Sequence, residues 1–467
     1  MKPTLTRRQF TFGASATLSM IGISSGCSGG SGDGDGDDMP VDAGQDERDP
    51  TVPGPEPESR WEPDGDLDVG VFPLGIQTGD ATDQAIVMSV QTSAEQVEVV
   101  LAEGTDTGYE EVVRTDAETV SGGFLQMDLA NLKPDTTYNV VCYVAGESTR
   151  SAVSRFRTAL HPDASRIVRM GATSCLGGNR PWPSLSQIAK ENLDFFAFLG
   201  DTIYADAYSD AAVSGLWQSE LSETGLQDIT AGTSMVATWD DHEVDNNWSW
   251  STNGMESRFA TCLADFQRYM PHRSGRSESG IWRKLSWGKT LDVFVLDCRS
   301  ERKDGNYISV EQMDWLKTGL SESTAHFKVI LNSVPIADFS AYFGSIGADD
   351  RWQGFPEQRS EILGHISEND IPRVLWLAGD LHVGGVGKVD EAPNAGADMW
   401  EVLAGPGGSS INFAAGFISP DERLPIVMDE HNSTMLAFDP DENTITVSFM
   451  TDSGEITKQR VIEYDAS

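Results

Sequence analysis

The sequence is poor in basic residues and in cysteine, and its apolar runs are short. Among 467 residues it has 33 Lys and Arg against 73 Asp and Glu, a formal net charge of −40. This charge argues against a nucleic-acid-binding surface or a basic surface for anionic lipid. Five cysteines are too few for a disulfide framework. No apolar run reaches the roughly 20 residues of a transmembrane helix, so we expect an acidic chain with two or three folded units.

The first 27 residues have the pattern of an export signal. Paired Arg7 and Arg8 precede a short apolar run over residues 12–23, which is typical of the twin-arginine (Tat) route. We therefore expect the Tat machinery to export the protein to the periplasm or the cell surface. The segment around Cys27 also resembles a lipoprotein cleavage site, except at Ser24, where Leu is usual. Cys27 is thus either a lipidated membrane anchor or part of a cleaved signal.

The composition changes twice along the rest of the chain. Residues 28–66 carry 13 Asp or Glu and two Arg amid Gly, Ser and Pro, so we expect a disordered acidic linker. Residues 67–160 contain short β-branched runs with turn signals, which predict a β-sandwich of fibronectin type III or immunoglobulin size. A Leu-x-Pro-x-Thr-x-Tyr segment ending at Tyr138 indicates a tyrosine corner. Residues 165–467 alternate strands with helical stretches, which predicts an α/β catalytic domain.

The catalytic domain should contain several buried strands and at least two helices. The predicted strands are Ile167–Met170, Phe195–Leu199, Met235–Trp239, Leu291–Leu296, Phe327–Leu331 and Val374–Ala378, and the predicted helices are Trp182–Asn192 and Val310–Leu320. Ala207–Thr233 and Trp248–Trp287 are rich in Ser and Gly and should form insertions that wall the substrate site. Alternating residues from Met435 to Phe449 predict a C-terminal hairpin.

Three of these strands end on carboxylates or imidazoles. Gly-Asp201 follows the second strand, the run Asp240–Glu243 follows the third, and Gly-Asp380-Leu-His382 follows the last. Because ligands of open α/β sheets gather beyond the carboxyl ends of the strands, we expect these residues to meet. Asp and His there hold two cations that activate a water between them. The run at 240–243 is the most informative, since its acidic side chains repel each other unless a cation or a cap takes up the charge.

Three other residues near these strand ends have more than one interpretation. Cys175 follows the first strand of the domain and is either a ligand or a small buried apolar residue. His242 either protonates a leaving group or orients a metal-binding carboxylate. Arg299 either binds a phosphoryl oxygen through two N–H groups or pairs with Asp297.

These motifs resemble the PhoD-type alkaline phosphatases of the calcineurin-like metallophosphatase superfamily. The matching segments are Gly200-Asp201-x-x-Tyr204, Asp240–Glu243 with Asn246-Asn247-Trp248, Leu296–Arg299, Gly379-Asp380-x-His382 and, in the β-region, Phe72–Asp80. The resemblance extends from about Asp68 to the C-terminus. It implies a layered αββα domain behind an N-terminal β-domain. It also implies an exported hydrolase of phosphoric esters that uses a metal-bound hydroxide.

The resemblance further implies a centre with two metal positions. Ferric iron, Fe3+, would be bound by Cys175, Asp201, Tyr204 and His382. Asp201 would bridge to a calcium position, Ca2+, completed by Asp380 and by either Asp240 or Asp241, and Asn246 and Asn247 would either serve this position or cap a turn. Thiolate, phenolate and carboxylate suit a trivalent ion, whereas calcium prefers oxygen ligands. Other divalent metals are compatible with the same oxygen ligands.

Two features depart from the family pattern. Cys298 stands where Thr is usual, and the chain ends in strand-like sequence instead of a closing helix, so we expect a more open site. The expected substrates are small-molecule or lipid phosphate esters, with the choice between monoester and diester left open. The alternatives are a phospholipase D-like phosphodiesterase and a catalytically inactive surface binding protein. The complete ligand set disfavours an inactive protein.

Overall fold

The computed structural model describes residues 61–465, apart from residues 106, 179, 276, 278, 304 and 346. The predicted export signal, Cys27 and the predicted linker up to residue 60 lie outside the described residues. Trp61, the first described residue, contacts an apolar cluster of Val100, Val141 and Tyr143, so packed residues already occur before the predicted boundary at residue 67. No helix in the described part of the chain is long and apolar enough to cross a membrane.

The N-terminal part, residues 61–160, is called the β-module and consists of two facing sheets. One sheet contains β1 (Asp66–Leu67), β4 (Gln96–Thr105), β5 (Gly108–Arg114), β6 (Glu118–Thr119), β8 (Thr137–Val144), β9 (Thr149–Arg150) and β10 (Ser154–Arg157), and the other contributes β2 (Ile76–Gly79), β3 (Ala85–Gln91) and β7 (Phe124–Ala130). Apolar side chains of both sheets share one core. The Lys133 N–H donates to the Tyr138 hydroxyl at 3.0 Å, as a tyrosine corner requires. The fibronectin or immunoglobulin class of this module stays a prediction.

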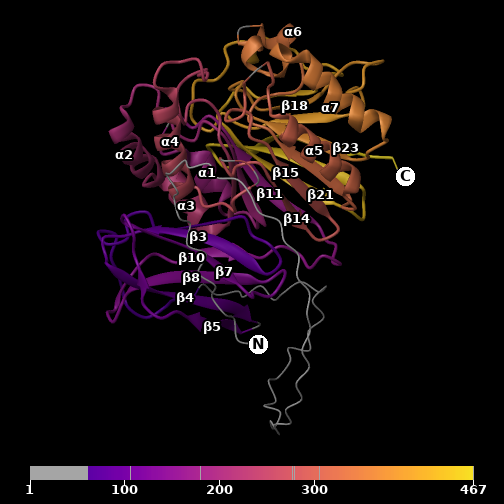
Figure 1. Cartoon of the computed structure of the whole chain (residues 1–467). Coiled ribbons are helices and arrows are strands. Elements are labelled where there is room, and N and C mark those ends of the chain that lie inside the picture. The colour runs from indigo at the N-terminus through magenta and orange to yellow at the C-terminus, as the bar shows by residue number, and fades with distance from the viewer. Residues whose placement is uncertain are drawn as a thin grey trace, which may run out of the picture.

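The β-module is joined to the catalytic domain through a shared sheet. The strand order β23-β22-β21-β11-β12-β13-β2-β3-β7 runs through both parts. The join is a parallel pairing of Gly79 in β2 with Met235 in β13 (Met235–Thr238). Because Met235 is the first residue of β13, the β-module lies at the start of this strand. Residues that follow the ends of the catalytic strands therefore lie at the opposite edge (Figure 1).

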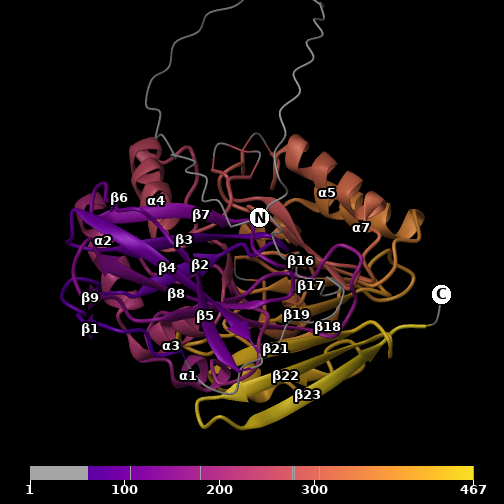
Figure 2. The ribbon, with the colours of Figure 1, turned by 90° about the horizontal axis from the view of Figure 1, so that it is seen from below.

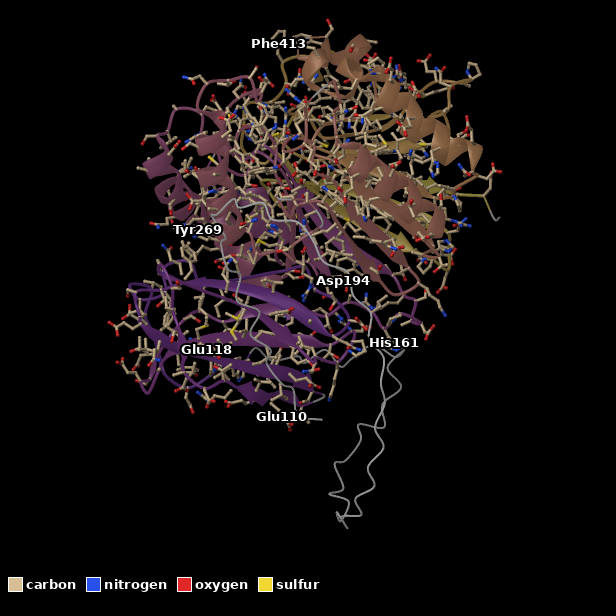
Figure 3. All side chains as sticks on the ribbon, in the orientation of Figure 1. Glu110, Glu118, His161, Asp194, Tyr269 and Phe413 are labelled. Atoms are coloured by element: carbon tan, nitrogen blue, oxygen red, sulfur yellow. The ribbon has the colours of Figure 1, made fainter. Side chains whose placement is uncertain are left out.

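Buried ion pairs strengthen the junction. The Arg283 guanidinium donates to both carboxylate oxygens of Asp80, at 2.5 and 2.7 Å. Arg166 lies between Asp135 of the β-module and Asp194 of the catalytic domain, at 2.6 Å from each. Figure 3 shows Asp194 close to where the two parts meet. These contacts make the β-module part of the same packed structure as the catalytic domain.

Asp80→Asn should destabilise the whole protein by about 3 kcal/mol, because Arg283 would keep a buried charge without an anionic partner. Thermal unfolding followed by circular dichroism would measure the change. Glu98→Gln is the matched control, because the Glu98–Arg114 pair is partly exposed and such pairs contribute only about 0–1 kcal/mol. An equal loss of stability in the two variants would contradict the proposal that the buried ion pair at the junction stabilises the whole protein.

The catalytic domain has four layers: helices, two sheets and helices. The first sheet contains β11 (Val168–Thr173), β12 (Phe195–Leu199), β13, β21 (Asn432–Asp439), β22 (Thr444–Thr451) and β23 (Ile456–Glu463), and the second contains β14 (Arg283–Trp287), β15 (Leu291–Val295), β16 (Phe327–Leu331), β17 (Val374–Ala378), β18 (Gly385–Lys388), β19 (Trp400–Leu403) and β20 (Ile426–Val427). One large apolar core lies between the sheets. In β12, Phe195 and Leu199 face this core while Phe196 faces the helices, as the two-residue period of a strand requires.

Helices cover the outer face of each sheet. The first sheet carries α1 (Pro183–Ile188), α2 (Asp210–Leu221), α3 (Thr224–Gly232) and α4 (Met255–Tyr269), and the second carries α5 (Val310–Glu322) and α7 (Pro356–Glu368), with the short α6 (Ser340–Phe343) near the top of Figure 1. In Figure 2, α2 and α4 lie on one side of the molecule and α5 and α7 on the other. The layered αββα arrangement agrees with the prediction.

The predicted strands are present, and they belong to the two sheets of the predicted αββα arrangement. Three other sequence-based predictions differ from the structure. The predicted insertion Ala207–Thr233 contains the helices α2 and α3, because Val213, Trp217 and Leu221 recur at helical spacing and pack on the sheet in α2. The segment Trp248–Trp287 likewise contains α4 and β14, and the predicted C-terminal hairpin is extended by β23.

Candidate metal centre

The turn after β12 brings Asp201 against the turn after β13. Gly200 precedes Asp201 with a φ of 97°, and a Cβ atom at Gly200 would lie 2.5 Å from the Cβ of Asp240. Only glycine permits this close approach of the two backbones. The glycine before the aspartate is therefore a requirement of the geometry that brings the two carboxylates together.

Four of the predicted ligands have left-handed backbone conformations. Their φ angles are 55° at Cys175, 55° at Asp201, 64° at Asp380 and 54° at His382. Such conformations at residues other than glycine cost on the order of 1–3 kcal/mol each and cluster at functional sites. The turns that follow β11, β12 and β17 are thus shaped to aim these side chains at a common point.

The first group of candidate ligands contains Cys175, Asp201, His382 and Tyr204. One ligand atom each of Cys175, Asp201 and His382 lies within 4.8 Å of the others. The Tyr204 hydroxyl is 3.3 Å from Asp201 Oδ2 and 3.2 Å from His382 Nε2. His382 Nδ1 lies 2.8 Å from the Ser410 carbonyl oxygen, a contact that an N–H makes, so Nε2 is left to face the group. The structure thus brings together the four residues predicted for iron.

The second group shares Asp201 with the first. One ligand atom each of Asp201, Asp241 and His242 lies within 4.8 Å of the others. The geometry therefore places Asp241, instead of Asp240, in this group. It also adds His242, which the sequence analysis did not place among the metal ligands.

Asp380 lies beside the two groups and not within either of them among the described residues. Its carboxylate accepts a hydrogen bond from Arg351 Nε. Burial raises the pKa of Asp380, although the charges of Arg351 and Arg299 oppose this effect. Asp380 thus borders the cluster, with one oxygen engaged by Arg351.

Arg299 holds acidic residues of the centre from inside the protein. Its Nε donates to Asp240 Oδ1 at 2.6 Å and its Nη1 to Asp350 Oδ2 at 2.5 Å. The side chain is only 1% exposed. Asp297 accepts the backbone N–H of Arg299 at 3.1 Å and does not form the predicted ion pair with the guanidinium. In this structure Arg299 holds Asp240, and its Nη2 has no hydrogen-bond partner among the described residues. Binding of a phosphoryl oxygen by Arg299 stays a prediction.

Glu243 fixes the spacing between the two acidic turns. Its Oε1 accepts the N–H of Thr202 at 2.6 Å, and its Oε2 accepts the N–H groups of Asp201 and Asp240 at 3.1 and 2.9 Å. From the sequence, Glu243 was predicted only as part of the run Asp240–Glu243, without a role of its own. Its position three residues after Asp240 is the signal that could have assigned it a structural role, because an acidic side chain at this distance reaches back to cap a turn.

Three further contacts support the centre and were missed by sequence reasoning. Both Asp206 carboxylate oxygens lie 2.8–2.9 Å from His242 Nδ1. The Ser409 hydroxyl donates to the Tyr204 hydroxyl at 2.6 Å. The Tyr204 ring also stacks on the His242 ring, with centroids 4.1 Å apart. No local motif marks Asp206 or Ser409, because their partners are distant in the sequence.

Asn246 and Asn247 are both exposed in the turn that follows the second group. Asn247 has a φ of 48°, and its backbone N–H donates to Asp241 Oδ2 at 2.6 Å. Of the two predicted roles, Asn247 therefore has the one in a turn. The role of Asn246, as a ligand of the second position or as a turn residue, stays open.

The centre holds more negative charge than its own basic residues compensate. Asp201 Oδ1 and Asp240 Oδ2 are buried without a hydrogen-bond partner. Burial, followed by the charges of Asp241 and Asp240, raises the pKa of Asp201 well above its usual range. Burial also raises the pKa of Asp240 to about 8 despite Arg299, and burial and the charge of Asp201 raise the pKa of the Cys175 thiol. Bound cations would supply the missing positive charge, so the residues fit metal ions.

Two solved structures share this fold. The structure of PhoD superposes with a TM-score of 0.69 at 21% identity, covering 84% of this chain and 89% of that one. The purple acid phosphatase PPD1 from yellow lupin (Lupinus luteus) seeds has a TM-score of 0.61 at 15% identity, covering 83% of this chain and 73% of that one. At these identities the comparisons establish the fold, which this chain shares with PhoD and with the purple acid phosphatase.

Sequence comparison identifies the family of this protein. The model of the PhoD-like phosphatases matches residues 170–416, more than half of the chain. The protein belongs to the PhoD-like phosphatase family, as its motifs indicated. Alkaline phosphatase D of Bacillus subtilis (strain 168) is 24% identical over 376 residues, which cover 67% of this chain. The chain spans 64% of the length of that relative.

Proposed function

We propose that this protein is an exported, metal-dependent hydrolase of phosphoric esters, acting as an alkaline phosphatase or a phosphodiesterase. The observation that carries the proposal is the pair of ligand groups that overlap at Asp201, with Cys175 and His382 in one group and Asp241 and His242 in the other. Membership of the PhoD-like phosphatase family and similarity to alkaline phosphatase D support it.

The two groups differ in the metal that they suit. Cys175, Tyr204, His382 and Asp201 would hold ferric iron, because thiolate and phenolate neutralise a trivalent ion. Asp201 and Asp241, bordered by Asp240 and Asp380, would hold calcium or another divalent ion through oxygen atoms. Held by these residues, two cations would supply a nucleophile from water at neutral pH and positive charge for the phosphoryl oxygens.

His242 is our candidate to deliver a proton to the leaving oxygen. Burial lowers the pKa of its imidazole, but the hydrogen bond to Asp206 and the charge of Asp241 outweigh burial and raise this pKa above its usual value. Asp206 and the stacked Tyr204 ring fix the orientation of the imidazole. With Nδ1 held by Asp206, Nε2 is the atom that would donate the proton.

The buried partners position the acidic ligands of the centre. Arg299 and the Ser333 hydroxyl, at 2.6 and 3.0 Å, orient Asp240 through Oδ1 and leave Oδ2 without a partner. Glu243 holds the backbone of Asp201 and Asp240. Orientation of this kind typically changes metal affinity or activity by about 10- to 100-fold.

Metal removal should affect the two positions in order. We expect the purified protein to be coloured, because phenolate or thiolate on ferric iron absorbs visible light whereas calcium, zinc and magnesium do not. A calcium chelator should abolish hydrolysis before iron is lost, because oxygen-only sites exchange faster than thiolate-anchored ones, and added calcium should restore it. Visible spectra, metal analysis and hydrolysis rates on one preparation provide the test. A colourless, iron-free and fully active protein would exclude the iron assignment.

The choice between monoester and diester is settled by turnover of a nitroaryl monophosphate and a nitroaryl diester. Preference for the diester would favour a phosphodiesterase, including phospholipase D-like cleavage of lipid esters. A catalytically inactive binding protein would hydrolyse neither ester. The complete set of Cys175, Asp201, Tyr204 and His382 argues against such loss of activity.

Export by the Tat machinery and lipidation of Cys27 are proposals from the sequence alone. Cell fractionation of the parent and of Cys27→Ser tests the anchor, because a lipidated protein would move from the membrane fraction to the soluble fraction. An unchanged distribution between the membrane and soluble fractions would contradict lipidation of Cys27.

A further inference from the structure

We propose that three exposed aromatic side chains, Tyr208, Phe413 and Phe417, bind an apolar organic group of the phosphoric ester. They are called the aromatic rim. The inference rests on the proposed function and names a substrate class for it: a phosphoric ester that carries an aryl or alkyl group, in preference to a polyol or sugar.

The aromatic rim is distinguished first by its exposure. Phe413 is 85% exposed, Phe417 76% and Tyr208 45%, and they are the aromatic members of the exposed large hydrophobic side chains in the described ranges. The other members are aliphatic and lie on the β-module, at the start of α5 or on β23: Leu67, Val69, Val112, Val310, Ile456 and Val461. Burial of a phenyl ring is favourable, and an exposed ring lacks this contribution. A ligand that covers the ring would therefore gain this free energy on binding.

The turn that carries Phe413 and Phe417 is attached to His382. The Asn412 N–H donates to the His382 carbonyl oxygen at 2.8 Å. On its inner side, Ala415 is buried in the apolar cluster that flanks His382. Both phenyl rings are left outside, with centroids 5.1 Å apart, and Figure 3 shows Phe413 at the edge of the molecule farthest from the β-module.

The segment that carries Tyr208 is attached to the other histidine of the centre. The Ala205 N–H donates to the His242 carbonyl oxygen at 2.8 Å, and the Tyr208 N–H donates to Ala205 at 2.8 Å. Asp206, two residues before Tyr208, holds the His242 ring. The segment that carries Tyr208 is therefore attached to the backbone of His242 through Ala205 and to its ring through Asp206.

The two aromatic segments border one site. Tyr204 stacks on His242 and reaches His382 Nε2 at 3.2 Å, so the two histidines are neighbours. Phe413 directly follows the residue bonded to His382, and Tyr208 lies one turn from the residue bonded to His242. Chain reach then places both aromatic residues within roughly 10 Å of a histidine of the centre, which is the span of an organic group attached to a phosphoryl group there.

Charge selects the chemical class of the ligand. The chain has a formal net charge of −40, and the carboxylates of Asp206 and Asp210 lie on the Tyr208 side of the site. A polyanion or an anionic membrane is repelled by such a surface. The ester itself brings its negative charge to the metal centre, and its uncharged organic part is left to contact the rings. Aromatic faces pack on aryl and alkyl groups in this way.

The test uses three phosphodiesters that share a p-nitrophenyl leaving group and differ in the second group: phenyl, hexyl or 2,3-dihydroxypropyl. For the parent, KM should be about 3- to 10-fold lower with phenyl or hexyl than with dihydroxypropyl. The double variant Phe413→Ser with Phe417→Ser, and separately Tyr208→Ser, should reduce this preference and leave kcat nearly unchanged. Val310→Ser is the control, because Val310 is also apolar and exposed, at 63%, and lies in α5, outside the aromatic rim. It should behave as the parent does.

Two outcomes would overturn the inference. An equal rise in KM for all three esters would show that the turn only supports His382. Loss of binding to phosphatidylcholine vesicles, with the KM preference intact, would assign the aromatic rim to a membrane surface.

Calorimetric titration separates this inference from the proposed function. If the protein hydrolyses no ester but binds phenylphosphonate more tightly than methylphosphonate, and the double variant loses the difference, the inference stands and the proposed function fails. Hydrolysis without any preference between the two phosphonates would contradict the inference alone.

Discussion

Asp201→Asn should remove bound metal and hydrolytic activity together. Asp201 is the residue common to both ligand groups, and a neutral amide cannot bridge two cations as a carboxylate does. Mutation of a residue that only orients a metal ligand lowers metal affinity or activity by about 10- to 100-fold. We therefore expect loss of the shared ligand itself to lower kcat/KM by at least about 10³-fold. Metal content per chain and turnover of a nitroaryl phosphate should be measured on the same preparation.

The control for this variant is Asp210→Asn. Asp210 is a partly exposed carboxylate in α2 that pairs with Arg258, and its loss should leave metal and rate unchanged. Unfolding is controlled separately. Burial and the neighbouring carboxylates Asp241 and Asp240 raise the pKa of Asp201, so removing its charge should not lower the melting temperature of the metal-free protein. A variant that retains both metals and full activity would show that Asp201 is not the shared ligand.

His242→Ala should retain metal and lose turnover, more on an alkyl phosphate than on a nitroaryl phosphate. General acid catalysis is typically worth about 10²–10⁴-fold, and a nitroaryl oxide leaves without protonation. The measurement is the ratio of variant to parent rates on the two esters, with iron determined in each sample. Asp206→Asn is the companion variant, and it should lose less activity, about 10- to 100-fold, because it removes only the partner of Nδ1.

The same experiment decides between the two roles that the structure allows for His242. Its ligand atom lies within 4.8 Å of those of Asp201 and Asp241, so it is also placed to bind the second cation. Loss of metal in His242→Ala would make it a ligand and would favour a transition metal over calcium, because imidazole suits the former and calcium prefers oxygen. If the metal is retained and the rates on both esters fall equally, His242 does not protonate the leaving group and has an electrostatic role.

The parts of the fold and site that the sequence predicted are those that depend on local patterns. The apolar runs at β12, β16 and β17 match the observed strands, because a buried strand needs a short unbroken apolar segment. Asp201 and His382 could be expected at one site because each directly follows a buried strand of a parallel pair. Strands β12 and β17 belong to different sheets, and the structure brings the residues after them together. The layered architecture followed from the family resemblance.

The missed features depend on contacts between segments that are far apart in sequence. The spacing of Trp217 and Leu221 was visible but was outweighed by the Ser and Gly content of the segment, so α2 was missed. Asp206 and Ser409 carry no motif, and only the folded chain brings them to His242 and Tyr204. The ion pair of Arg299 with Asp240 likewise joins residues from different turns.

The measurement that tests the account most directly is the rate of nitroaryl phosphate hydrolysis as a function of bound metal in one preparation. The account predicts a rate that rises with iron occupancy, disappears when the second cation is chelated and returns when that cation is added back. A metal-free protein that hydrolyses the ester at the full rate would contradict it, as would a fully metal-loaded protein that hydrolyses neither a monoester nor a diester.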